Sequence, residues 1–287
     1  MKTSLAHLPE TKQDQIRHIT KIIEEVANPE MVILFGSYAK GNYVEHKYTG
    51  RDGIRYEYIS DFDFLVVMKG NTVKEYELDD IITNRARMYR PPVNLEIHEI
   101  DYINEGLGFG QYFFADIVKE GILLFDKSTV QFAKPRVLTP FDQKQIAQRY
   151  FDKWLKRGKA FLKGVAVYLA EKELNEGAFT LHQVTESFYY ATLLVFTGYK
   201  PKTHNLAKLR KQAKSLSEEL YLVFPLEDDK NEMHLFDLLK RGYVDARYKD
   251  DYVITERELA ALIERVSKMQ GIVEGICREK ISLFEKL

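Results

Sequence analysis

The sequence has little of what marks membrane-embedded, disulfide-rich or strongly charged proteins. Its single cysteine, Cys277, excludes an internal disulfide. No apolar run approaches the roughly 20 residues that span a bilayer, and the first ten residues lack the pattern of a signal peptide. The 42 basic and 43 acidic residues give a formal net charge of −1, so the whole chain offers no basic field to nucleic acid. We expect a cytoplasmic protein with no membrane partner.

Two kinds of pattern divide the chain into an α+β part and an all-α part. Up to residue 128, helical periodicity alternates with short apolar runs that are typical of buried strands. Residues 129–140 lack periodicity and contain two prolines, which indicates a linker. We therefore predict a small mixed-sheet domain over 1–128, followed by a helical bundle over 141–287.

Apolar runs, helix caps and Gly or Pro residues set the expected elements. In the first part we predict a helix that ends at Asn28-Pro29, strands over 31–35, 62–68, 93–98 and 122–125, a hairpin within 43–59, and helices over 72–89 and 110–120. In the second part we predict a helix capped by Thr139, helices over 180–196, 205–214 and 230–248, and a last helix with a Thr255/Glu258 capping box.

A turn-forming pair, Gly36-Ser37, comes directly after the first apolar strand. Glycine allows a tight turn and a close approach of the backbone to phosphate, while serine offers a hydroxyl and an N–H group. We take Gly36, Ser37 and Lys40, all from the run GSYAKG, as candidate residues for binding a nucleotide. Alone, a Gly-Ser pair is most often an ordinary turn.

Three carboxylates follow on the next two predicted strands. Asp61 and Asp63 stand two residues apart, so both side chains should project from one face. Two carboxylates so close are costly to ionise together unless a cation lies between them. Glu96 alternates with apolar neighbours and should point away from them, with His98 on its side as a supporting partner. We predict that Asp61, Asp63 and Glu96 are catalytic residues and metal ligands.

Each of these features also has a simpler explanation. An Asp-x-Asp is usually part of a solvated strand or turn, and Glu96 alone would be an exposed residue on a half-buried strand. The order of the features favours the functional explanation, since unpaired acids directly before the apolar run 64–67 would be poorly tolerated. Together they predict a site for a metal ion and a nucleotide.

The runs GSYAKG and SDFDFLVV resemble those of the minimal nucleotidyltransferases of the DNA-polymerase-β-like superfamily, whose signature is Gly-Ser, a spacer and Asp-x-Asp. The similarity covers roughly residues 11–127. It implies that Gly36 and Ser37 hold the triphosphate of ATP or another NTP. It further implies that Asp61 and Asp63 bind two Mg²⁺ ions and that Glu96 completes an acidic triad.

The chain departs from this family pattern in two ways. The predicted hairpin lengthens the spacer between Ser37 and Asp61, and the third acid is Glu rather than the usual Asp. The insert also carries tyrosines at positions 43, 48, 56 and 58. They could stack on a base or an acceptor, although cross-strand packing explains them more simply.

The second part resembles a HEPN domain, a helical bundle often fused or paired with such nucleotidyltransferases. The resemblance rests on LHQVTE at 181–186, PKTHNL at 201–206 and ARY at 246–248. Many HEPN domains are ribonucleases that use an Arg followed, after four to six residues, by a His. No His in this chain stands at that spacing after an Arg, so we expect no ribonuclease of that mechanism.

The remaining polar residues of these runs allow two roles. His182 and His204 are predicted to be packing or capping residues rather than catalytic ones. Arg247, with Lys200 and Lys202, could contact phosphate or nucleic acid.

Three functions remain open from the sequence. The favoured one is Mg²⁺-dependent transfer of a nucleoside monophosphate, with ATP as the favoured donor, to a hydroxyl of a protein, a tRNA or a small molecule, releasing pyrophosphate. The second is an antitoxin-like or regulatory module that binds nucleotide without turnover. The third is a helical toxin that cleaves RNA. The helical part could also pair with a second copy to form a homodimer.

Overall fold

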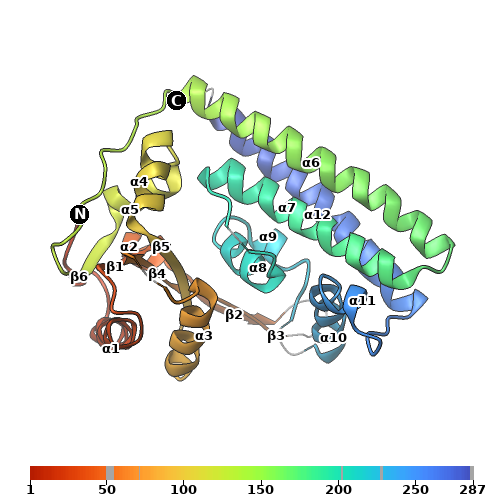
Figure 1. Cartoon of the computed structure of the whole chain (residues 1–287), viewed down its shortest axis with the longest axis horizontal. Coiled ribbons are helices and arrows are strands. Elements are labelled where there is room, and N and C mark those ends of the chain that lie inside the picture. Colours follow the sequence, from red (N-terminus) through yellow and green to blue (C-terminus); the bar gives the residue numbers. More distant parts are fainter. Residues whose placement is uncertain (50–54, 71, 202, 227–228, 285–287) are drawn as a thin grey trace. The chain divides into compact units, whose positions relative to one another are not determined.

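The computed structural model describes residues 1–49, 55–70, 72–201, 203–226 and 229–284 (Figure 1). The chain forms two units, Met1–Val137 and Leu138–Leu287, and the division falls inside the predicted linker. The first unit combines a mixed sheet with helices, and the described part of the second is helical without strands. Nowhere in the described residues does a helix reach the length and apolar character needed to span a bilayer.

The sheet of the first unit has four strands in the order β5-β4-β1-β6. Their bounds are β1 Met31–Phe35, β4 Phe62–Met68, β5 Val93–Glu99 and β6 Ile122–Asp126. β1 runs antiparallel to β4 and β6, whereas β4 and β5 are parallel. All four predicted strands are confirmed. Apolar runs of five to seven residues are long enough for strands but too short for helices, and β5 shows instead the alternation of apolar and polar residues that is typical of a strand.

Helices cover both faces of this sheet (Figure 1). On one face, α1 (Glu10–Ala27) and α3 (Glu75–Ala86) pack against the apolar side chains that alternate residues of β1, β4 and β5 direct toward them. Ile16, Ile19 and Ile23 of α1 are fully buried there. On the other face lie α4 (Ile100–Phe109) and α5 (Tyr112–Glu120). Helix α4 was not predicted, since its run IDYINEGLGF contains two glycines, which are poor helix formers.

The predicted hairpin insert is present between α2 (Gly36–Lys40) and β4. It consists of β2 (Glu45–Thr49) and β3 (Arg55–Ile59), which pair antiparallel, and the predicted turn at 50–53 lies outside the described residues. At its base, Ser60 N donates to Val44 O and Val44 N donates to Ser60 Oγ, at 2.8 and 2.9 Å. This pairing closes the long spacer and returns the chain to the sheet directly before Asp61.

The second unit is a helical bundle around α7. Its helices are α6 Pro140–Ala170, α7 Leu174–Thr197, α8 Leu206–Lys214, α9 Glu218–Tyr221, α10 Lys230–Arg241, α11 Asp245–Tyr248 and α12 Glu256–Leu283. Helix α7 is buried over most of its length between α6 and α12. The predicted cap at Thr139 and the predicted capping box at Thr255 are both confirmed, and Thr139 also forms a capping box, with Asp142.

The single helix predicted over 230–248 is wrong, because α10 ends at Arg241 and α11 starts only at Asp245. Gly242 lies at the break, packed so closely on α7 that an added Cβ would lie 2.9 Å from the carbonyl oxygen of Ala178. The contact is long-range, so the local helical pattern could not reveal it.

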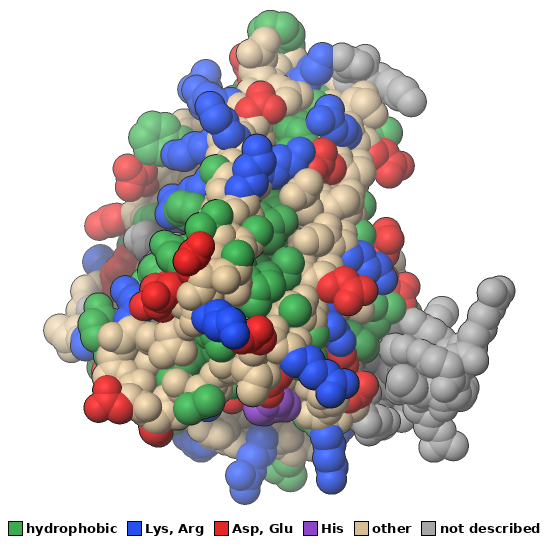
Figure 2. Space-filling model, turned by 90° about the vertical axis from the view of Figure 1, so that its right-hand side faces the viewer, with side chains coloured by type: hydrophobic (Ala, Val, Ile, Leu, Met, Phe, Trp, Pro, Cys, Tyr) green, Lys and Arg blue, Asp and Glu red, His purple; other side chains and the backbone are tan. Residues whose placement is uncertain are grey.

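The surface carries both charge signs: in the view of Figure 2, basic and acidic side chains are interspersed with apolar ones, in keeping with the net charge of −1.

Candidate functional site

The Gly36-Ser37 turn lies directly against the Asp-x-Asp strand. Strand β1 ends at Phe35, which pairs with Asp63 of the antiparallel β4. Gly36 has a φ of +72°, a conformation that favours glycine. An added Cβ at Gly36 would lie 2.3 Å from Asp63 Oδ2, so no other residue fits without moving that carboxylate. The Gly36 backbone therefore lies so close to the Asp63 carboxylate that a side chain at this position would clash with it.

Asp63 projects from the sheet face opposite the α1/α3 core. Its neighbours Phe62 and Phe64 belong to that core, so alternation along the strand turns Asp63 the other way. Asn94, its register partner on β5, donates from Nδ2 to Asp63 Oδ1 at 2.8 Å. The sequence-based prediction missed Asn94, although it shares its parity with Glu96 and His98. Only the parallel register of β4 and β5 shows that it is the residue beside Asp63.

Glu96 and His98 form a buried pair on the same face of β5. Both are only 3% exposed, and His98 Nε2 lies 3.0 Å from Glu96 Oε2. The predicted partnership of these two side chains is therefore present. Glu96 pairs in register with Leu65, which places its backbone two residues farther along the strand than Asp63. The third predicted acid is thus deeper in the unit than the other two.

Asp61 precedes β4 and is 8% exposed. Beside it, Tyr38 of α2 is fully buried and donates its hydroxyl to Glu45 Oε1 at 2.9 Å. Burial, the contact with Glu45 and the charges of nearby groups including Asp61 raise the pKa of Tyr38 far above its ordinary value. The phenol therefore stays protonated. Tyr43 stacks on the ring of Tyr38 in α2 at 4.3 Å, so this insert tyrosine packs within the unit, against a helix rather than across a strand pair.

Lys40 forms an ion pair in the structure. Its Nζ lies 2.7 Å from Oε2 of Glu120 at the end of α5. The hydrogen bond from Lys40 holds the pKa of Glu120 below its usual value. Because both side chains are partly exposed, this ion pair contributes little stability. Lys40 can therefore exchange Glu120 for an anion that binds it more strongly, such as a phosphate.

The donor set can be tested against Mg²⁺. In the part of the chain that the structure describes, no three His, Cys, Asp or Glu side chains form a group that could by itself hold a metal ion. Mg²⁺ usually binds through one or two carboxylates, completing its shell with water and substrate phosphates. Asp61 and Asp63, two residues apart at the start of β4, supply the two carboxylates that an open site of this type needs. The three-carboxylate ligand set stays a prediction.

In the second unit, the polar residues of the predicted motifs form one network. His182 of α7 is 1% exposed. Its Nδ1 lies 3.0 Å from the carbonyl oxygen of Leu239, and its Nε2 lies 3.1 Å from that of His204. Burial lowers the pKa of His182. The buried Glu186 lies 2.5 Å from His204 Nδ1. His182 is thus a packing residue as predicted, whereas half of the His204 side chain is exposed.

Comparison with known proteins characterises the second unit. The family model of the HEPN domain matches residues 151–276, which run from α6 into α12. This match confirms the HEPN resemblance of the helical part. The chain matches none of the curated proteins with which it was compared.

Proposed function

We propose that the first unit is a Mg²⁺-dependent nucleotidyltransferase. An acceptor hydroxyl attacks the α-phosphorus of a nucleoside triphosphate, with ATP as the favoured donor. The new O–P bond forms as the bond to the β-phosphate oxygen breaks, so pyrophosphate leaves and the hydroxyl proton passes to a carboxylate. A bound Mg²⁺ would neutralise charge on the phosphates.

One observation carries this proposal: Gly36 and Asp63 meet at a distance that only glycine allows. A bare backbone beside a carboxylate suits a triphosphate with its metal ion, because backbone N–H groups would bind the phosphates and the carboxylate would bind the metal. The fold produces this contact from segments that are far apart in the sequence.

The chain's own residues divide the work as follows. Gly36 and Ser37 bind the terminal phosphates. Lys40 exchanges its ion pair with Glu120 for a contact with the same phosphates. Asp61 and Asp63 would hold the metal, with Asn94 fixing the orientation of the Asp63 carboxylate. Glu96, held by His98, lies deeper and accepts the proton together with Asp63. The HEPN match supports the proposal as well, because such bundles are often paired with nucleotidyltransferases.

Incubation with α-labelled ATP, Mg²⁺ and a panel of protein, tRNA and small-molecule acceptors tests the proposal. We expect label transfer and pyrophosphate release, and a loss of about 100-fold or more in Asp63→Asn. Asp101→Asn, a matched change at an exposed position of α4, should transfer label normally. Absence of binding and transfer with all four NTPs would overturn the proposal. ATP binding without pyrophosphate release would instead favour the regulatory module.

A further inference from the structure

The carboxylate of Glu45 joins the hairpin insert to the Gly36-Ser37 turn. Glu45 is the first residue of β2, and its Oε1 accepts a hydrogen bond of 2.9 Å from the hydroxyl of Tyr38. Tyr38 follows Ser37 directly in α2 and is fully buried. The insert thereby contacts the segment that is proposed to bind phosphate.

Helix α2 has five residues, little more than one turn, so its own hydrogen bonds give it little stability. Contacts of Tyr38 with other segments hold it in place. The Tyr38 ring stacks on Tyr43 at 4.3 Å and lies 4.6 Å from the ring of Phe62, the residue between the two aspartates. His7 Nε2 lies 2.8 Å from the carbonyl oxygen of Tyr38. The position of the N–H and hydroxyl groups of Ser37 therefore depends on how the next residue is anchored.

Lys12 of α1 holds Glu45 in turn. Its Nζ lies 2.5 Å from Glu45 Oε1, and 17% of the lysine side chain is exposed against 41% of the glutamate side chain. The same Nζ lies 5.9 Å from the centre of the Tyr38 ring. Glu45 and Asp61 both raise the pKa of Tyr38, so the two carboxylates share one neighbourhood, and the Lys12 cation offsets part of their negative charge.

The base of the insert also leads to the carboxylates of the proposed site. Val44 and Ser60 exchange two hydrogen bonds there, and Ser60 directly precedes Asp61. Glu45, the neighbour of Val44, reaches Tyr38 and thus the phosphate turn. One hairpin base therefore contacts both halves of the proposed site.

We propose that Glu45 is a positioning residue of the nucleotide site: through Tyr38, it holds the Gly36-Ser37 turn in the conformation that binds the terminal phosphates. This inference rests on the proposed function and adds the insert to it. Backbone N–H groups bind phosphate tightly when they are already oriented, because ordering them on binding costs free energy. Removal of the Glu45 acceptor would leave the buried Tyr38 hydroxyl without this hydrogen bond, and the short helix would shift to find another.

Binding of ATP with Mg²⁺ to the full chain, measured by calorimetry, tests the inference. Glu45→Ala and Tyr38→Phe should each weaken ATP binding by about fivefold or more, the factor that one such hydrogen bond contributes. The double variant should bind ATP no more weakly than either single variant, because both changes remove the same bond. AMP lacks the terminal phosphates, so its affinity should be the same in all variants.

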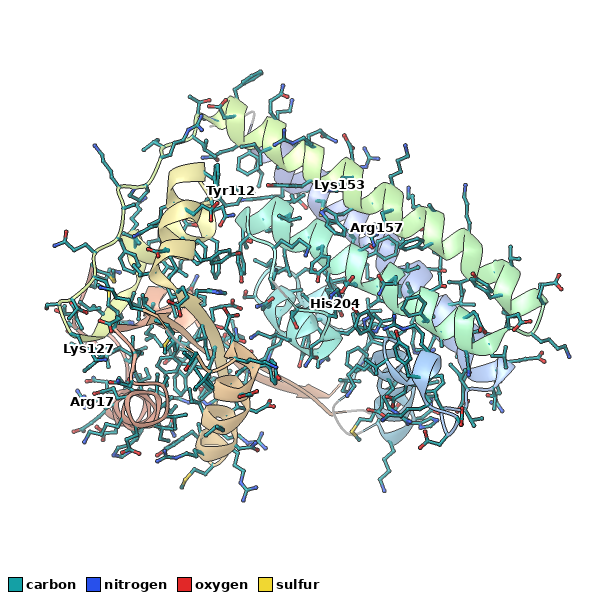
Figure 3. All side chains as sticks on the ribbon, in the orientation of Figure 1. Arg17, Tyr112, Lys127, Lys153, Arg157 and His204 are labelled. Carbon is teal, nitrogen blue, oxygen red and sulfur yellow. The ribbon has the colours of Figure 1, made fainter. Side chains whose placement is uncertain are left out.

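Two control variants separate this hydrogen bond from a general loss of stability. Glu45→Gln keeps an oxygen that accepts from Tyr38, so its ATP affinity should stay within about twofold of wild type, since a partly exposed ion pair contributes little. Asp14→Ala removes another carboxylate that pairs with a base of α1, here Arg17 at 2.8 Å. Figure 3 labels Arg17 on that helix. Because Asp14 does not contact α2, this variant should bind ATP normally.

Hydrogen exchange of the amides of residues 36–41 gives a readout without nucleotide. Exchange should be faster in Glu45→Ala and Tyr38→Phe than in wild type, and unchanged in Asp14→Ala. ATP affinity of Glu45→Ala within about twofold of wild type, or equal weakening by Asp14→Ala or Glu45→Gln, would overturn this inference and leave the proposed function intact. Absence of nucleotide binding by the wild-type chain would overturn both.

Discussion

Replacing Gly36 by alanine tests the contact on which the proposed active site depends. The change adds one methyl group at a residue with φ +72°. That methyl would lie 2.3 Å from Asp63 Oδ2 and 3.1 Å from its Cγ, so the carboxylate must move away. Asn94 donates to Oδ1 of the same carboxylate at 2.8 Å, and the movement strains this hydrogen bond too.

The expected cost has two parts. The left-handed conformation alone costs alanine about 1–2 kcal/mol. Displacement of the carboxylate strains a hydrogen bond to a charged group, a class worth about 1.5–3 kcal/mol, so a similar further cost is expected. Because Oδ2 must move by about 1 Å, activity should fall by about 100-fold, far more than stability alone would explain.

Gly70→Ala is the matched control. Gly70 has a φ of +64°, and an added Cβ would have no neighbour within 4 Å. Urea unfolding followed by circular dichroism should therefore show only the first cost, with normal transfer of label. In a double-mutant cycle, Asp63→Ala should remove the second cost of Gly36→Ala, giving a coupling of about 1–3 kcal/mol. Equal stability and activity of Gly36→Ala and Gly70→Ala would refute the reasoning.

Two further substitutions and one labelling experiment probe the two units. Asn94→Ala should lower transfer and raise the Mg²⁺ concentration for half-maximal activity, because the Asp63 carboxylate loses its anchor; an unchanged Mg²⁺ dependence would contradict this. Gly158→Ala should destabilise the helical unit by about 1–3 kcal/mol in urea unfolding followed by tryptophan emission, since the new Cβ would lie 2.4 Å from a phenylalanine ring of α7. Burial raises the pKa of Cys277 to about 12, so its thiol should resist a thiol reagent at pH 8 until urea unfolds the bundle; rapid labelling of the native chain would count against the buried position.

Local signals explain what the sequence predicted correctly. The strands 31–35 and 62–68 are apolar enough to be buried on both faces, and the cap at Thr139 and the capping box at Thr255 mark helix starts within a few residues. Such features need no tertiary information. The pairing of Glu96 with His98 was equally local, since residues two apart on a strand share a face.

Long-range contacts explain what the sequence left out. The role of Asn94 depends on its register with Asp63, 31 residues away. The break after Arg241 depends on the packing of Gly242 against α7. Of the three basic residues singled out in the second part, Lys200 follows α7 and Arg247 lies in α11, whereas Lys202 lies outside the described residues.

The position of the candidate acids is set by residues that take no part in the chemistry. Leu95 and Ile97 point into the core with α1 and α3, and this alternation turns Asn94, Glu96 and His98 to the other face. A one-residue slip of β5 against β4 would carry all three polar side chains into the apolar core, at a cost no nearby partner could offset. The hydrophobic pattern therefore fixes the register of β5 against β4, and this register places Asn94 beside Asp63. Core packing on one face of the sheet thereby specifies the proposed active site on the other.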